Sequence, residues 1–256
     1  MAAEILVVAN QKGGIGKTTT ALALFDCLHH RGKKCLYVDL DPQCNGTDNL
    51  CVQVDGVGTA YDLLVDGDMD CIQQTDRGDV IAGDPLLKDA PKQLDGVSGN
   101  YRLREGLAAI RERYDFIIVD TPPALSVLLI NALTAADKVI IPLTADRFGL
   151  QGLVQLKETI IEIRKYTNPN LTVAGLLLIK YSDRTNLAKN VYGNLPEYAA
   201  LFDSKIYETK IRESVKAREA QAGRKSLYEW ASSCTTAEDY NALISEMIEK
   251  GDLSNG

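Results

Sequence analysis

The sequence is poor in the residues from which metal centres and disulfide frameworks are built. It contains two histidines and six cysteines, and no two of the cysteines form a Cys-x-x-Cys pair. The spacing of a bound metal site is therefore missing, and free buried thiols are the expectation. Apolar runs are also short, since none approaches the roughly 20 residues that a membrane-spanning helix needs.

An excess of positive charge is missing as well. The 28 Lys and Arg residues are outnumbered by 35 Asp and Glu, for a net charge of −7, so any contact with nucleic acid must come from a local patch. A length of 256 residues, 45% of them hydrophobic, suits one large globular domain. No repeat or linker divides the chain, so we predict a single domain over residues 1–256. No secretion signal precedes the first apolar run, which predicts a cytoplasmic protein.

Short apolar runs alternate with helical patterns from end to end, and the runs are continuous, as in strands buried on both faces. The predicted strands are Ile5–Ala9, Cys35–Val38, Phe116–Val119, Val139–Ile141 and Val173–Ile179. The predicted helices are Thr18–His30, Tyr101–Arg113, Leu150–Tyr166, Asn186–Tyr198 with a kink or end near Pro196, and a last one that begins near Thr235 with Glu238 placed to cap it. Residues Asp84–Gly99 are predicted to form a surface loop. The alternation predicts an α/β fold: a doubly wound, mostly parallel sheet with helices on both faces.

A glycine-rich loop follows the first predicted strand. Its residues are Lys12, Gly13, Gly14, Ile15, Gly16, Lys17 and Thr18. Glycines let consecutive backbone N–H groups turn inward on a phosphate chain, and the helix that follows adds its positive end. Lys17 can reach the terminal phosphates and the Thr18 hydroxyl can bind Mg²⁺. Gln11 stands where the usual P-loop has its first glycine, and the second lysine, Lys12, is left available for another task.

Carboxylates follow two other predicted strands. Asp39 and Asp41 stand at the end of the second strand, and alternation sends both to the same side, beside the glycine loop. The run Phe116–Val119 ends in Asp120, which has the form of a Walker B strand. Carboxylates in these places can support Mg²⁺ through its water shell and orient an attacking water.

Together these segments resemble the deviant Walker A ATPases and, among them, the ParA-type DNA-partition ATPases. The likeness is carried by Asn10–Thr20, by Val38–Gln43 and by Tyr114–Pro123, and it continues in Asn131–Asp137 and Asp183–Leu187. It covers nearly the whole chain and implies a P-loop ATPase that uses ATP and Mg²⁺.

The resemblance also implies roles for single residues. Nucleotide contacts are implied for Gly13, Gly14, Ile15, Gly16, Lys17, Thr18 and Thr19, with Ile211 and Arg212 near the adenine. Metal contacts are implied for Thr18, Asp39 and Asp120. The family forms an ATP-dependent sandwich homodimer in which Lys12 would cross to the partner subunit's phosphates, as an arginine finger does. Asp41 would position or activate the water, so Lys12, Lys17 and Asp41 are the implied catalytic residues.

Two departures from the family pattern stand out. The usual Asp-Pro-Gln-Gly-Asn-Ala-Thr is here Asp41-Pro42-Gln43-Cys44-Asn45-Gly46-Thr47, an exchange that we interpret as moving the flexible residue along the loop. The Ile-Pro-Arg-Asn block near the adenine is here Ile211-Arg212-Glu213-Ser214, without the proline.

The second half of the chain carries the candidate DNA surface. Its basic residues include Arg184, Lys216 and Arg218. Arg184 and Lys216 match the family's DNA-contacting positions. Such a patch would bind the phosphates of double-stranded DNA without reading sequence. Because Glu208, Glu213 and Glu219 are interleaved, a solvated charged face is the alternative interpretation.

The favoured function is an ATPase that segregates plasmid or chromosomal DNA together with a ParB-like centromere-binding partner, and that is associated with the nucleoid. A MinD-like ATPase that positions a division site or protein cargo at a surface is the alternative. The acidic ending Ile244–Asp252 would be repelled by anionic lipid, so we expect no stable membrane association. An electron-transfer ATPase would need a cluster-ligating cysteine after the Walker B strand, and residues 124–137 contain none.

Overall fold

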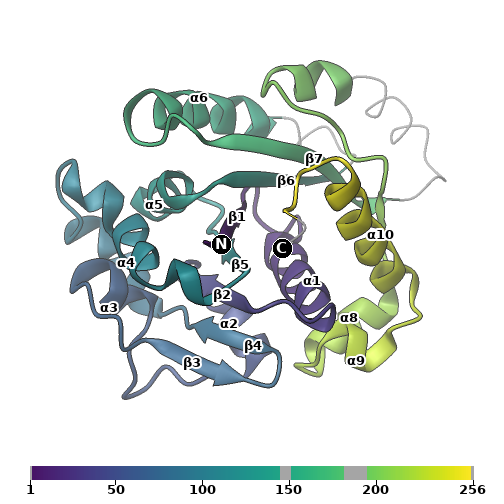
Figure 1. Cartoon of the computed structure of the whole chain (residues 1–256), viewed down its shortest axis with the longest axis horizontal. Helices are drawn as coiled ribbons and strands as arrows, with labels where there is room; N and C mark the ends of the chain where they lie inside the picture. Colours follow the sequence, from purple (N-terminus) through teal and green to yellow (C-terminus); the bar gives the residue numbers. More distant parts are fainter. Residues whose placement is uncertain (1, 145–150, 182–194, 255–256) are drawn as a thin grey trace.

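The computed structural model describes residues 2–144, 151–181 and 195–254. Within them, eight strands form one sheet in the order β3-β4-β2-β5-β1-β6-β7-β8 (Figure 1). The strands are β1 Glu4–Val8, β2 Cys35–Asp39, β3 Ile72–Thr75, β4 Gly78–Ile81, β5 Phe116–Asp120, β6 Lys138–Thr144, β7 Thr172–Tyr181 and β8 Ile211–Arg212. All neighbours are parallel except β3 and β4, which form an antiparallel hairpin at one edge.

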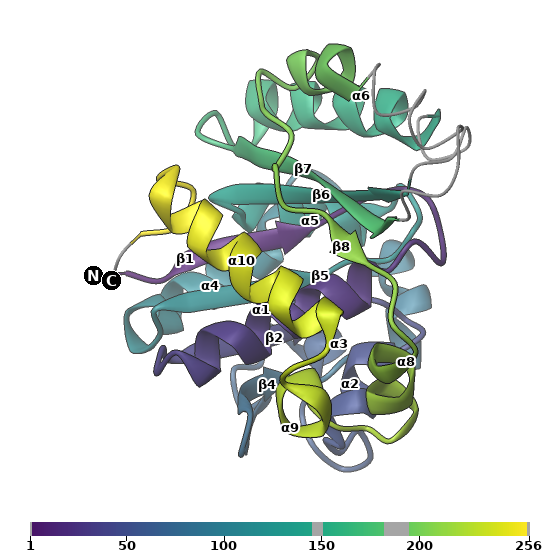
Figure 2. The ribbon, with the colours of Figure 1, turned by 90° about the vertical axis from the view of Figure 1, so that its right-hand side faces the viewer.

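Helices cover both faces of the sheet. The α-helices with defined bounds are α1 Lys17–His30, α2 Asn45–Leu50, α3 Ala60–Val65, α4 Arg102–Ile110, α5 Val127–Ala135, α6 Gln151–Tyr166, α8 Val215–Ala222, α9 Leu227–Ala231 and α10 Thr235–Glu249. One buried apolar cluster lies between the sheet and α3 to α6, and another lies between the sheet and α1, α8, α9 and α10. Figure 2 shows α10 lying across the second face, beside α1. The predicted doubly wound α/β fold is confirmed.

The central strands match the sequence pattern that predicted them. All residues of β2 and β5 are buried, as expected for continuous apolar runs covered on both faces. The five predicted strands are present, each with slightly shifted ends, and Asp39 and Asp120 prove to be the last residues of β2 and β5. In the register of these two strands, Asp39 lies directly beside Asp120. The sheet therefore delivers both carboxylates to one place.

Several elements differ from the prediction. The hairpin β3–β4 was not predicted because β3, Ile-Gln-Gln-Thr, is short and polar at the sheet edge. The region Asp84–Gly99 is not a simple surface loop, since it contains short 3₁₀ turns and buries Leu87, Ala90 and Leu94. Most of the predicted helix over residues 186–198 lies outside the described residues, and its described part continues as helix through residue 200, past Pro196.

The predicted capping role of Glu238 is wrong. The N-cap of α10 is Cys234, and no side-chain hydrogen bond caps this helix. Packing holds the helix in place instead, because Tyr240, Leu243 and Met247 are buried against the sheet face that α1 also covers. The apolar side of α10 is thus used inside the molecule.

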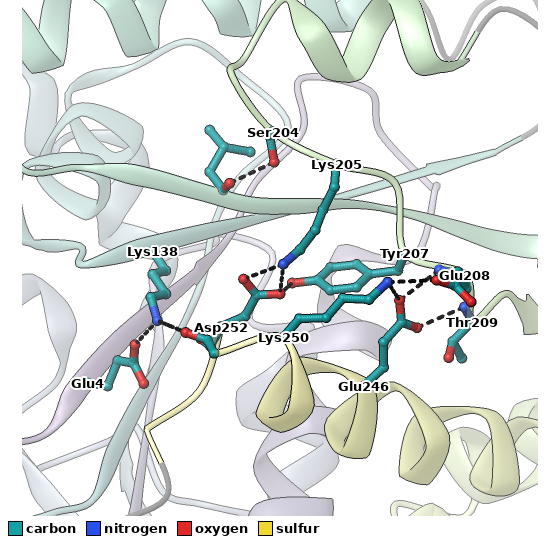
Figure 3. A network of polar contacts seen from close by, with 12 residues as sticks. Glu4, Lys138, Ser204, Lys205, Tyr207, Glu208, Thr209, Glu246, Lys250 and Asp252 are labelled. Atoms are coloured by element: carbon teal, nitrogen blue, oxygen red, sulfur yellow. Dashed lines mark hydrogen bonds and ion pairs between the residues drawn. The ribbon is translucent and has the colours of Figure 1, made fainter.

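Polar contacts fasten the carboxyl-terminal end of the chain to the sheet (Figure 3). Lys205 Nζ and the Tyr207 hydroxyl both donate to the Asp252 carboxylate, at 2.8 and 3.1 Å. Glu246 on α10 accepts hydrogen bonds from the backbone N–H groups of Glu208 and Thr209. These contacts tie α10 to the strand-like segment that leads into β8, and β8 borders the site described next.

Candidate functional site

A cavity of about 500 Å³ opens at the carboxyl ends of β1, β2 and β5. Parallel α/β sheets place their ligand sites at this edge, where the connecting loops part. Its lining includes the loop residues Gly13, Gly14, Gly16, Lys17, Thr18 and Thr19, together with Asp41 and the segment from Ile211 to Ser214. The structure therefore brings together residues that lie about 200 positions apart in the sequence.

The glycine loop has the backbone shape that its sequence predicts. Gly14 and Gly16 have φ angles of 69° and 103°, in the left-handed region that other residues avoid. Gly16 is also the N-cap of α1, and no side chain caps that helix end. The first N–H groups of α1 consequently face the cavity with only the loop in front of them, an arrangement suited to an anion.

The two lysines of the loop are placed differently. Lys17 is buried, with 6% of its surface exposed, and its Nζ donates to the backbone oxygen of Lys12 at 3.1 Å. Burial lowers the pKa of Lys17, while the charges of Asp120 and Asp41 oppose that shift. Lys12 is not part of the cavity lining, and its backbone N–H is held by the Asn10 side chain at 3.1 Å. Lys17 thus points along the loop, whereas the Lys12 side chain lies outside the cavity wall.

The two carboxylates at the end of β2 lie in different surroundings. Asp41 lines the cavity, and its Oδ1 accepts from the N–H of Gln43 at 3.0 Å. Asp39 is fully buried and absent from the cavity wall. Its oxygens accept from the N–H of Asp41 and from the N–H and hydroxyl of Thr47, at 3.0, 2.9 and 2.7 Å. Asp39 therefore fixes the loop that presents Asp41.

Asp120 is fully buried at the end of β5. It accepts hydrogen bonds from the Tyr37 hydroxyl and from the N–H of Thr121, at 3.2 and 3.0 Å. Burial, followed by the charge of Asp39 beside it, raises the pKa of Asp120 above that of an ordinary carboxyl group, and burial also raises the pKa of Asp39. Asp39 and Asp120 are thus two adjacent buried carboxyl groups whose ionised forms a bound cation would stabilise.

These groups fit Mg²⁺ bound with a nucleotide. Among the described residues, no group of three His, Cys, Asp or Glu side chains could hold a metal ion by itself. Mg²⁺ does not require such a cage, because it keeps several waters and is bound by one or two carboxylates plus phosphate oxygens. The Thr18 hydroxyl, which bonds to Asp120 and lowers its pKa, supplies a further oxygen at the same place.

The far wall of the cavity is built by β8 and α10. Arg212 is held by Asp239 through paired contacts, with Nη2 to Oδ1 at 2.7 Å and Nε to Oδ2 at 3.0 Å. The Thr236 hydroxyl donates to the backbone oxygen of Arg212, and the Tyr240 and Thr20 hydroxyls lie 2.9 Å apart. Ile211 and Arg212 line the cavity, although the proline of the family pattern is absent; their contact with an adenine stays a prediction.

The candidate DNA residues fall into two groups. Lys216 and Arg218 both lie on α8, and each is paired with a glutamate: Lys216 with Glu219 at 3.0 Å and Arg218 with Glu213 at 3.2 Å. Arg218 also lines the cavity. Arg184 lies outside the described residues.

Several cavity residues were not predicted from the sequence. Lys180, just after the apolar part of β7, donates from Nζ to the backbone oxygen of Gly14 at 2.8 Å. Gln43 and Asn45 also line the cavity. A lysine at the carboxyl end of a predicted parallel strand was the available signal for Lys180. Ile15 is buried beneath the loop and does not reach the cavity.

The parallel sheet, the glycine loop between β1 and α1 and the aspartate that ends β5 define a P-loop nucleotide-binding protein with a second lysine in its loop. A family profile described as an AAA domain (AAA_31) matches residues 3–173. The chain belongs to the ParA/Soj family of chromosome-partitioning ATPases, in the ParA/MinD superfamily.

Three relatives carry this assignment. Sporulation initiation inhibitor protein Soj of Bacillus subtilis is 38% identical over 254 residues, covering 97% of this chain and 99% of its own. Chromosome partitioning protein ParA of Caulobacter vibrioides is 36% identical, covering 96% of this chain and 94% of its own. Chromosome-partitioning ATPase Soj of Thermus thermophilus is 37% identical, covering 96% and 95%. The resemblance inferred from the motifs is confirmed.

Solved structures agree with the fold. Apo McdA from Cyanothece has a TM-score of 0.86 and 26% identity, covering 96% of this chain and 99% of that one. Cobyrinic acid a,c-diamide synthase from Mycobacterium smegmatis, with bound ADP and magnesium, has a TM-score of 0.77 and 29% identity, covering 91% and 98%. No helix in the described part of this chain is long and apolar enough to cross a membrane.

Proposed function

We propose that this protein is an ATP-hydrolysing partition protein that dimerises on ATP, binds DNA without sequence preference and moves plasmid or chromosomal DNA. The observation that carries the proposal is the cavity in which the glycine loop, Lys17 and Asp41 meet the segment around Arg212. A nucleotide fits this arrangement, with its phosphates on the loop and its base toward β8. The curated relatives named as partition proteins match nearly the whole chain, which supports the same assignment.

In this proposal, different groups of the protein contact the phosphates and the Mg²⁺ of bound ATP. Backbone N–H groups from Gly13 to Thr19 cradle the phosphates, and Lys17 neutralises the β and γ phosphates. The Thr18 hydroxyl and the Asp120 carboxylate would hold Mg²⁺, which would supply positive charge to the phosphates. Asp39 acts on that ion through its charge and through the Asp41 loop, because its own oxygens are used by Thr47 and Asp41.

Hydrolysis requires a water and a second positive charge. Asp41 lines the cavity, which supports assigning it the task of orienting the water. Lys12 does not line its own cavity, and we assign its charge to the nucleotide of a second copy of the chain that faces this one. In the proposed homodimer it reaches the partner's γ-phosphate and stabilises the charge of the departing phosphoryl group.

DNA binding follows from the dimer. One copy of α8 presents a weak basic patch around Lys216 and Arg218, whose charges are shared with nearby glutamates. Two copies on one particle bind a duplex through multivalency, so affinity follows the nucleotide state. A ParB-like centromere-binding protein and DNA would stimulate the weak basal ATPase. The protein would then act in the cytoplasm, on the nucleoid.

The MinD-like alternative receives less support. A protein of that kind works at a surface, whereas the apolar residues Tyr240, Leu243 and Met247 of α10 are buried within the molecule and are not offered to lipid.

Sedimentation velocity combined with phosphate release tests the proposal. The wild type is expected to be monomeric without nucleotide and with ADP, to dimerise with ATP and Mg²⁺, and to release phosphate slowly. Lys17→Ala, which removes the phosphate contact, serves as the non-binding control. A wild type that binds ATP but stays monomeric and hydrolyses nothing would refute the proposal.

A further inference from the structure

A tyrosine side chain contacts Asp120 from the interior of the protein. Tyr37, in the middle of β2, is fully buried, and its hydroxyl donates to Asp120 Oδ2 at 3.2 Å. Its ring packs against Phe25 of α1, with centroids 5.5 Å apart and planes tilted by 60°.

The same hydroxyl fills the space beneath α2. A Cβ atom built on Gly46 would lie 2.2 Å from the Tyr37 hydroxyl oxygen and 2.8 Å from two of its ring carbons. Gly46 is helical and does not have a positive φ, so its backbone conformation does not demand glycine. The glycine is needed because α2 rests on the tyrosine hydroxyl.

The helix resting on this hydroxyl is tied to the catalytic loop. Thr47, the neighbour of Gly46, donates twice to the carboxylate of Asp39. The N-cap of α2 is Cys44, whose N–H donates to the backbone oxygen of Asp41 at 2.8 Å. A single hydroxyl group thus stands between the Asp120 carboxylate and the helix that follows Asp41.

We propose that Tyr37 is a positioning residue that orients the carboxylate of Asp120 for Mg²⁺ and sets the height of α2, and with it Asp41, above the sheet. Gly46 is part of the same arrangement, because only glycine leaves room for the Tyr37 hydroxyl beneath α2. The inference rests on the proposed function, because it assigns Asp120 to the Mg²⁺ of bound ATP.

Tyr37→Phe tests the hydroxyl while keeping the ring. The concentration of Mg²⁺ that half-saturates binding of a fluorescent ATP analogue is expected to rise roughly tenfold, at the low end of what loss of an outer-shell partner does. Binding of the same analogue with excess chelator should not change. The melting temperature of the nucleotide-free protein should fall no more than it does for the control variant below.

Tyr114→Phe is the matched control. Tyr114 is also a buried residue whose hydroxyl donates to a carboxylate, Asp79 Oδ2 at 2.6 Å, in a partly buried contact, and neither residue borders the cavity. This variant should lose a similar hydrogen bond and keep the wild-type Mg²⁺ requirement.

Gly46→Ala and a compensating double variant distinguish the packing of α2 on Tyr37 from the orientation of Asp120 by the Tyr37 hydroxyl. The added methyl group should push the tyrosine away from Asp120, lower the melting temperature and raise the Mg²⁺ requirement. In Tyr37→Leu/Gly46→Ala, where the smaller side chain makes room for the methyl group, the melting temperature should recover while the Mg²⁺ requirement stays high.

Two results would overturn the inference. One is an unchanged Mg²⁺ requirement in Tyr37→Phe, and the other is a normal Mg²⁺ requirement in Tyr37→Leu/Gly46→Ala, which would make the tyrosine a core filler. A wild type whose binding of ATP is indifferent to Mg²⁺ would refute the proposed function itself, and this inference with it.

Discussion

At the scale of single residues, the two loop lysines differ in where they lie. Lys17 is buried beside the phosphate cradle, whereas Lys12 contributes its backbone oxygen to Lys17 and does not line the cavity. Burial lowers the pKa of the Lys17 ammonium group because it is removed from water. Bound phosphates would supply the negative charge that stabilises its protonated form. Lys12 does not line the cavity of its own subunit.

We expect Lys12→Ala to retain ATP affinity within a few-fold of the wild type and to lose ATP-dependent dimerisation and stimulated turnover. Lys17→Ala should lose ATP binding itself. Calorimetric ATP titration and sedimentation of the same samples would measure both effects. Equal loss of ATP binding in the two variants would contradict this division of labour.

Asp41→Asn should trap the ATP-bound dimer. An amide can still accept the hydrogen bond from the N–H of Gln43, so the turn is kept while the carboxylate that orients water is lost. Turnover is expected to fall by about 10²–10⁴-fold, as for a lost general base. Single-turnover phosphate release and sizing in ATP would check this, and a normal rate would show that another group positions the water.

The exchange between Cys44 and Gly46 shows what sequence reasoning could and could not reach. We interpreted Gly46 as taking over the flexibility of the usual glycine, and that interpretation is wrong. Cys44 itself has a φ of 53°, so the left-handed position has not moved. Gly46 is required by the hydroxyl of Tyr37, a contact between two elements that no local pattern encodes.

At the scale of elements, the sequence predicted what depends on local pattern. Continuous apolar runs identified the five central strands, because burial on both faces leaves no polar alternation. The glycine loop and the acids that end β2 and β5 could be placed at one sheet edge for the same reason. The polar hairpin β3–β4, two-residue β8 and the contact of Lys180 with Gly14 depend on tertiary pairing and were missed.

The attachment of α10 should depend on pH through Glu246. Partial burial acts to raise its pKa, but hydrogen bonds from Lys250 and from Thr209 outweigh burial and lower it to about 2 (Figure 3). A carboxyl group with a lowered pKa stabilises the fold above its unfolded pKa, and that contribution is lost as the pH falls through the folded pKa.

Comparing the wild type with Glu246→Gln isolates this contribution. Urea unfolding at pH 7 should show the wild type to be the more stable, and the difference between the two proteins should shrink as the pH is lowered from about 4.5 toward 2. A difference that stays constant over this interval would show that the carboxylate is not held in its ionised form by its partners.

At the scale of the whole molecule, we propose that ATP-driven dimerisation turns the weak basic patch on α8 into a DNA-binding surface. The chain is acidic overall, with a net charge of −7, so we expect non-specific attraction to DNA to come from a local basic patch, of which α8 is the described part, and from its counterpart in a dimer. The glutamates beside Lys216 and Arg218 weaken that patch in each copy. Binding should consequently require two copies.

Lys216 and Glu219 do not line the cavity, so the patch can be weakened or strengthened without changing a residue of the proposed nucleotide site. Lys216→Ala should weaken duplex binding, and Glu219→Gln should strengthen it about two- to fivefold, the range that an exposed ion pair represents. Arg184→Ala is predicted to act as Lys216→Ala does. None of these changes should alter ATP-driven dimerisation.

The most direct test is a salt titration of binding to duplexes of unrelated sequence, with ATP, with ADP and without nucleotide, beside a sizing measurement on the same samples. We predict binding with ATP alone, equal affinity for every sequence, and a slope of log affinity against log salt that falls by about 0.9 for each phosphate contact removed. Tight binding with ADP, preference for one sequence, or a normal ATP dimer that binds no DNA would contradict the account.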